Sequence, residues 1–173
     1  MTGLDKAIRG LSIAVMFAAS ATALAQQEEA EELTLQQANA IVSMAIERAR
    51  EMGYRPLTVV VLDDAGNLKA MQREDGASMF RFDIAVGKAW ASVGMGTSSR
   101  FLAERARDNP NFFITLANTA DGKFLPQPGG VLIRDAEGHI LGAAGASGAA
   151  GSEDEDAVAQ GIRDAGLFTD LDD

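Results

Sequence analysis

The sequence predicts one α+β domain in which helices pack against an antiparallel sheet. Helical and β-branched segments follow one another in the order helix, two strands, two helices, two strands, helix. The strands of each pair are separated by only a few turn-forming residues, which is enough for a hairpin but too short for a parallel crossover. With 173 residues, the chain is long enough for one hydrophobic core and too short for two ordinary domains.

The first helix is predicted to begin at Thr34. Thr34 and Gln37 have the spacing of a capping box, in which each side chain accepts a hydrogen bond from a free backbone N–H. Gly53 suits the left-handed turn that ends many helices. Between these positions, apolar residues recur at helical spacing: Leu35, Ala38, Ile41, Val42, Ala45, Ile46, Ala49 and Met52.

The next segments form a predicted hairpin. Residues 57–62 are rich in valine and leucine, as expected of a buried strand, and residues 68–73 return as its partner. The connection over residues 63–67 contains Asp, Gly and Asn, which favour turns.

Two helices are predicted after the hairpin, over residues 78–93 and from residue 98 or 99 to about residue 107. Residues 112–116 are apolar, and such a short run does not distinguish a strand from a short helix.

The last third of the chain is rich in glycine. Residues 131–134 and 139–145 read as two strands joined by a turn, and a helix is predicted over residues 152–165. Ser152 and Glu155 have capping-box spacing, and acidic residues gather in the first turn, where the helix dipole favours them.

The N-terminal segment has the pattern of a secretory signal peptide over residues 1–25, with basic residues, an apolar run and Ala23-Leu24-Ala25 before the cleavage point. A membrane anchor is the alternative, but the apolar run is shorter than the roughly 20 residues a spanning helix needs. We therefore expect a periplasmic or secreted protein whose mature form has no membrane segment. A polar spacer over 26–33, a domain over 34–168 and an acidic tail over 169–173 follow.

Composition excludes several classes of site. With 15 Lys and Arg against 25 Asp and Glu, the formal net charge is -10, which argues against nucleic acid as a partner. The chain has no cysteine and one histidine, so thiolate chemistry and a multi-histidine metal site are excluded within one chain. We also expect no metal site in the acidic run 153–156. Acidic residues are favoured in the first turn of a helix by its dipole, which explains the run more simply.

Three groups of motifs are spread across the chain. Residues 59–68 read VVVLDDAGNL and are followed by REDGA at 73–77, and residues 84–89 read IAVGKA. Residues 129–133 read GGVLI and residues 138–148 read GHILGAAGASG, followed by Asp154-Glu155 and Ala159-Gln160-Gly161. In this order and spacing they resemble the GlcG/HbpS family of haem-binding or haem-degrading proteins, which includes the C-terminal domain of PduO-type proteins.

The resemblance implies a profilin-like fold with a central antiparallel sheet and a protein that self-associates into homo-oligomers. It also implies a small-molecule ligand, haem or a small organic acid, and makes haem the first cofactor to test. The histidine ligand found near the N-terminus of the PduO-like branch has no counterpart in the first helix of this chain.

Polar residues at the expected junction of strand and helix are candidates for holding a carboxylate. They are Arg73, Asp75 and Gly76, together with Lys88 in the following helix. Fixed cations suit the carboxylates of a small acid or of haem propionates. The structural alternative is that Arg73 or Lys88 pairs with a carboxylate of the protein itself.

Three further positions are candidates for lining the flat face of a haem. Phe124 is a flat aromatic residue, and Gly129 and Gly130 permit close approach of the backbone. His139 and Tyr54 are candidate axial ligands, since haem iron is bound by such side chains. The alternative for His139 is an exposed residue at the start of a strand.

Together these observations predict an exported, oligomeric ligand-binding protein that serves haem sensing, storage or degradation. An enzyme acting on a small carboxylate is the first alternative, and a non-catalytic accessory subunit is the second. Catalysis is disfavoured because the sequence contains no evident nucleophile–base pair.

Overall fold

A computed structural model describes residues 32–172 of the chain. The predicted signal peptide and nearly all of the predicted spacer lie outside these residues. Glu31–Asp173 form one compact unit. No helix within residues 32–172 is both long enough and apolar enough to cross a bilayer.

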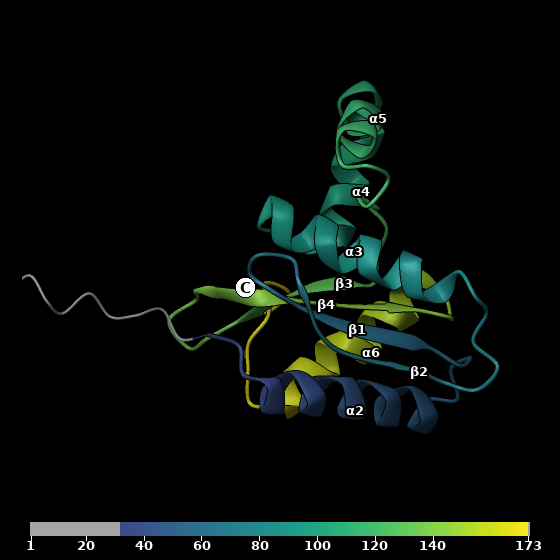
Figure 1. The fold of residues 1–173 in the computed structure, drawn as a ribbon, viewed down its shortest axis with the longest axis vertical. Helices are drawn as coiled ribbons and strands as arrows, with labels where there is room; N and C mark the ends of the chain where they lie inside the picture. Colours follow the sequence, from purple (N-terminus) through teal and green to yellow (C-terminus); the bar gives the residue numbers. More distant parts are fainter. Residues whose placement is uncertain (1–31, 173) are drawn as a thin grey trace, which may run out of the picture. The chain divides into compact units, whose positions relative to one another are not determined.

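The core of this unit is a four-stranded antiparallel sheet with the order β2-β1-β4-β3 (Figure 1). Its strands are β1 (Thr58–Asp63), β2 (Leu68–Arg73), β3 (Gly130–Arg134) and β4 (Ile140–Ser147). Both hairpins therefore form as predicted. The long connection between them brings β4 next to β1 in the middle of the sheet.

Five helices surround or extend this sheet: α2 (Leu35–Glu51), α3 (Arg81–Met95), α4 (Ser99–Asp108), α5 (Pro110–Thr119) and α6 (Gly151–Asp164). One face is covered by α2 and α6, whose apolar side chains join those of the strands in the largest core cluster. The other face is covered by α3, while α4 and α5 extend from the outer side of α3 (Figure 1). The predicted α+β architecture is confirmed.

Local sequence chemistry explains most helix boundaries. The predicted capping box at the start of α2 is present, with the Gln37 backbone donating to the Thr34 hydroxyl oxygen at 3.1 Å and the Thr34 backbone donating to the Gln37 side chain at 2.9 Å. Pro110 occupies the first turn of α5, where it needs no hydrogen-bond donor. Residues 112–116, which the sequence does not assign to a strand or a helix, are therefore helical.

The predicted capping box of α6 is wrong. The helix begins at Gly151, so Ser152 lies inside the first turn and does not cap it. The Ala150 backbone donates to the Glu153 side chain at 3.0 Å instead. A carboxylate one turn into the helix thus replaces the expected serine.

The acidic C-terminal segment packs against the domain rather than extending from it. Phe168 exchanges two backbone hydrogen bonds with Arg134, the last residue of β3, at 2.8 and 3.0 Å. Thr169 is buried, and Asp172 is paired with Arg163 of α6. Backbone hydrogen bonds, side-chain acceptors and the contacts of Leu167 and Leu171 with the main core cluster together hold this segment in place.

Candidate functional site

Lys88 occupies the contact between α3, β4 and α6. Its side chain is buried, and its ammonium group donates to Asp154 Oδ2 at 2.8 Å and to the Ala146 carbonyl at 3.0 Å. Burial raises the pKa of Asp154, and the charge of Lys88 opposes that increase. A buried carboxylate therefore balances the predicted ligand-binding lysine, which joins α3 to α6.

Gly129 and Gly130 lie directly against this lysine. A Cβ atom at Gly129 would be 2.8 Å from Lys88 Nζ, and one at Gly130 would be 2.3 Å from the Lys88 carbonyl oxygen. Gly129 also has a φ of +115°, which side-chain-bearing residues rarely adopt. The structure thus brings together three of the predicted site residues, and a helix rather than a flat ligand fills the space beside the glycines.

The acidic run 153–156 is divided among different partners. Glu153 caps its own helix, and the next three carboxylates meet three different cations. Asp154 pairs with Lys88 at 2.8 Å, Glu155 with Arg100 at 2.7 Å and Asp156 with Arg48 at 2.9 Å. Within residues 32–172, no group of three or more metal-ligating side chains gathers around one point.

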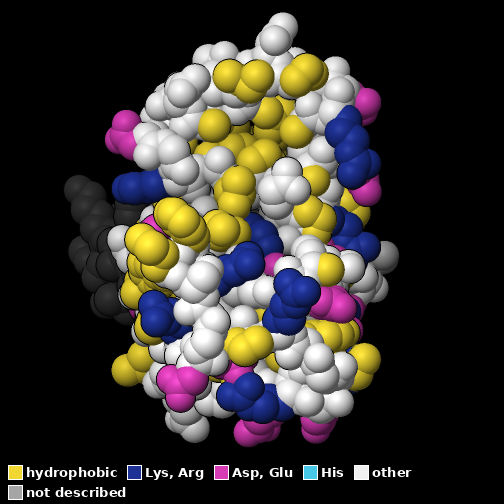
Figure 2. Space-filling view, turned by 90° about the vertical axis from the view of Figure 1, so that its right-hand side faces the viewer, with side chains coloured by type: hydrophobic (Ala, Val, Ile, Leu, Met, Phe, Trp, Pro, Cys, Tyr) yellow, Lys and Arg dark blue, Asp and Glu magenta, His cyan; other side chains and the backbone are white. Residues whose placement is uncertain are grey.

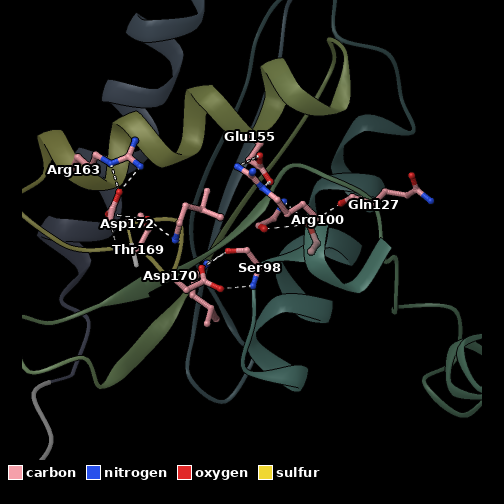
Figure 3. A network of polar contacts seen from close by, with 12 residues as sticks. Ser98, Arg100, Gln127, Glu155, Arg163, Thr169, Asp170 and Asp172 are labelled. Atoms are coloured by element: carbon pink, nitrogen blue, oxygen red, sulfur yellow. Dashed lines mark hydrogen bonds and ion pairs between the residues drawn. The ribbon is translucent and has the colours of Figure 1, made fainter. Parts of the chain in front are cut away.

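A polar network links α4 to the C-terminal segment and to α6 (Figure 3). Asp170 accepts hydrogen bonds from the backbone and the hydroxyl of Ser98, and Glu155 faces Arg100. Burial raises the pKa of Glu155, against the opposing effect of the Arg100 hydrogen bond. Sequence reasoning missed this network, because Ser98 and Asp170 are separated by 72 positions and share no local pattern.

Phe124 is buried among the helices that extend from α3. Its ring centroid lies 5.9 Å from that of Phe113, and Ala91 and Leu102 complete the cluster. The ring therefore packs inside the protein, where it stabilises the connection between the two hairpins, rather than forming an open wall.

His139 lies in the turn between β3 and β4, one residue before β4 begins. Its Nδ1 is 2.9 Å from Asp135 Oδ2, and its backbone donates to Asp135 Oδ1 at 2.8 Å. Burial of Asp135 opposes ionisation, but the hydrogen bonds from His139 outweigh that effect and lower the pKa of this carboxyl. The imidazole is 62% exposed, so a buried carboxylate orients a histidine ring that reaches the surface.

Tyr54 lies near the other end of β4, after α2. It lines a hollow of about 500 Å³ together with Gly53, Arg55, Ala149, Ala150 and Glu153. The Tyr54 hydroxyl donates to Asp156 at 3.1 Å. Burial and this hydrogen bond raise the tyrosine pKa, so the phenol stays protonated at neutral pH.

Arg73, Asp75 and Gly76 lie at the same end of the sheet as Tyr54. Arg73 is exposed at the end of β2, opposite Thr58 of β1, and Asp75 and Gly76 are exposed in the following loop. The structure therefore separates the predicted site residues, with Arg73 and His139 at opposite ends of the sheet and Lys88 between the layers.

Arg81 is a cation at this sheet end that sequence reasoning missed. It begins α3, and its Nη1 donates to the Ser147 hydroxyl oxygen at 3.3 Å. A signal was present, because Arg81 precedes Lys88 by seven residues and so lies on the same side of the helix.

With this geometry established, comparison with known proteins identifies the family. The family described as haem-degrading protein HbpS-like matches residues 33–163. The chain belongs to this family. The match spans every strand and helix described above except the last residue of α6, and it confirms the resemblance inferred from the motifs.

Solved structures of HbpS-like proteins share the fold. A crystal structure of HbpS is 29% identical, with a TM-score of 0.69, and the match covers 80% of this chain and 93% of that one. A double mutant of the Streptomyces reticuli HbpS gives the same identity and TM-score, covering 80% of this chain and 90% of the other. No curated protein matches the chain.

A PduOC–heme complex shows the same fold at lower identity. It is 24% identical, with a TM-score of 0.73, and the match covers 80% of this chain and 99% of that one. In this HbpS-like chain, His139 with its orienting carboxylate has the chemistry of an iron ligand, whereas the protonated Tyr54 fits that role less well.

Proposed function

We propose that this HbpS-like protein binds haem and takes part in haem sensing, storage or degradation. The observation that carries the proposal is the family match over residues 33–163, joined to the shared fold.

For the iron ligand we propose His139. The Asp135 carboxylate next to Nδ1 holds the ring in one orientation, as such partners do for metal-binding histidines. The bound haem would supply a redox-active iron, while the protein's own residues orient it and set its surroundings.

The test is a hemin titration of the purified protein followed by the Soret band. We expect a saturable shift near one equivalent per subunit, which His139→Ala abolishes. Tyr54→Phe is the matched control and should leave the spectrum unchanged. A linear, non-saturating response in the wild type would refute haem binding, and an unchanged spectrum of His139→Ala would refute the ligand assignment alone.

We also propose that the protein is exported and self-associates. The sequence pattern over residues 1–25 supports export, and N-terminal sequencing of the protein from its native cells should then begin at Gln26. The family resemblance supports oligomers, for which light scattering at micromolar concentration should give a mass of several subunits. A retained leader or a monomeric mass would refute the respective proposal.

A further inference from the structure

One end of the sheet carries a row of polar side chains that neither the fold nor the proposed iron ligand explains. In the strand register, Thr58 lies directly opposite Arg73 on one side and Ser147 on the other. Residues paired in this way project from the same face of a sheet. Arg73, Thr58 and Ser147 therefore form a row across β2, β1 and β4.

This row lies on the face that α3 covers. Val60 and Leu62 of β1 pack against α3, and Thr58 follows the same alternation along the strand. The Arg81 guanidinium at the start of α3 reaches the Ser147 hydroxyl at 3.3 Å. The first turn of α3 thus lies at the row, and no side chain caps this helix start.

Two features of the row are those of an incomplete polar site. The Thr58 hydroxyl is fully buried and has no hydrogen-bond partner among the residues described, although buried hydroxyls almost always have one. Neither Arg73 nor Arg81 forms a close ion pair with a carboxylate within residues 32–172, although the charge of Arg81 acts on Asp154 from a longer distance and opposes the increase in its pKa. Lys88, by contrast, is already paired with Asp154.

The surface around the row is basic. The end of the sheet on the right of Figure 1 faces the reader in Figure 2, where Lys and Arg side chains gather near the centre although the whole chain has a formal net charge of -10. A positive cluster on an acidic protein attracts small anions to that position.

We propose that this sheet end is a carboxylate-binding site. Arg73 and Arg81 would hold the two oxygens of the ligand, and the hydroxyls of Ser147 and Thr58 would donate to it from below. The same chemistry has two sources, a free small organic acid or a haem propionate. Because His139 lies at the opposite end of β4, the site is separate from the proposed iron ligand of the same chain.

The experiment follows binding by backbone amide NMR shifts in the full-length protein, with acetate, succinate and benzoate as probes. At least one acid should shift the signals of Thr58, Ser147 and Arg81 saturably. Arg73→Gln and Arg81→Gln should each weaken that binding about tenfold or more, since each removes a charge-assisted hydrogen bond. Lys69→Gln, at the turn end of the same β2, is the matched control and should change the affinity less than about twofold.

Thr58→Val separates ligand binding from structure. Because the substitution removes an unpaired buried hydroxyl and keeps the shape of the side chain, it should raise the midpoint of thermal unfolding. It should also weaken binding of the organic acid, because one donor of the site is lost. A purely structural threonine would give a lower midpoint, and that result with unchanged binding would count against the site.

Hemin and hemin dimethyl ester distinguish the two sources. If a haem propionate occupies the site, the wild type should bind the dimethyl ester more weakly than hemin, and the arginine variants should bind hemin more weakly than the wild type does. If a free organic acid occupies the site, the arginine variants should lose binding of the acid while their affinity for hemin stays unchanged. Arginine variants that bind both ligands as the wild type does would overturn the proposal. A wild type that binds no hemin would refute only the proposed haem function, because the organic-acid titration still tests the site.

Discussion

Individual atoms decide which glycines of this chain can be replaced. At Gly130 a methyl group would overlap the Lys88 carbonyl oxygen, whereas at Gly94, within the same α3 helix as that lysine, no atom lies within 4 Å of the corresponding position. The sequence does not distinguish these two glycines, because it does not show which atoms surround each of them. Only the packing of β3 against α3 makes the first of them irreplaceable.

Gly130→Ala should therefore lower the free energy of unfolding by at least about 2 kcal/mol, because the new methyl forces β3 and α3 apart. Gly94→Ala is the matched control and should be neutral or stabilise the protein by up to about 1 kcal/mol, since alanine is the better helix former. Urea unfolding of both variants measures the difference. Equal stability of the two would show that the β3–α3 contact is not as close as described.

Burial also determines the consequence of changing one member of an ion pair. Asp154→Asn should lower the free energy of unfolding by about 3 to 5 kcal/mol, because the Lys88 ammonium then stays buried without its carboxylate. Lys88→Met with Asp154→Leu removes both charges and should recover most of that loss. Chemical denaturation compares the two proteins. If the single variant were as stable as wild type, the pair would be solvated rather than buried.

At the scale of elements, α4 depends on a residue far along the chain. Ser98 precedes α4, but its hydroxyl forms no cap of its own helix; Asp170 accepts from both the Ser98 backbone and its hydroxyl. The C-terminal segment thus provides the N-terminal cap of α4. The acidic character of this segment was evident from the sequence, whereas its role as a cap was not.

Asp170→Ala should remove that cap and cost about 1 kcal/mol of stability. The loss should concentrate in α4, so amide hydrogen exchange in its first turn should accelerate. Glu104→Ala, an exposed change in the same helix, serves as the control and should leave exchange in that turn unaltered. Uniform acceleration throughout the protein would instead indicate a global effect.

At the scale of the whole molecule, neighbouring carboxylates on α6 respond to pH in opposite directions. Burial raises the pKa of Glu155, so its contribution to stability is greatest below its usual pKa and is lost as pH rises. Arg48 lowers the pKa of Asp156, so its contribution is present above its usual pKa and is lost as pH falls.

Two variants test this opposition, Glu155→Gln and Asp156→Asn, measured by urea unfolding between about pH 3 and pH 7. Relative to Glu155→Gln, the wild type should lose stability as pH rises; relative to Asp156→Asn, it should gain stability over the acidic part of the range. Parallel pH profiles of the two differences would contradict the assigned pKa directions.

Local patterns predicted the elements of this fold well, and long-range contacts account for what they did not predict. The apolar stripe of α2 and the turn that contains Gly66 act within a few residues, so helix and hairpin follow directly from them. The stripe is buried from Ala38 to Ala49, whereas Leu35 and Met52, predicted as its two ends, are exposed. The cap predicted for α6 is wrong because the helix begins after Ala150, whose side chain gives no capping signal, and Glu153 rather than Ser152 accepts the hydrogen bond at the helix start. The candidate site depends on longer distances still. Lys88, predicted to bind a ligand or to pair with a carboxylate of the protein, is paired with Asp154 across 66 positions, whereas the role predicted for Arg73 stays a prediction.

The sequence by itself determined the order of helices and strands, the hairpin pairing and the HbpS-like family, because periodicity, turn chemistry and motifs are properties of neighbouring residues. Tertiary structure alone decided which cation meets each α6 carboxylate and that β4 lies beside β1. It also decided that Thr58 shares a row with Arg73 and Ser147. These facts join segments up to 108 positions apart, and only the packing of helices and strands against one another brings such segments into contact.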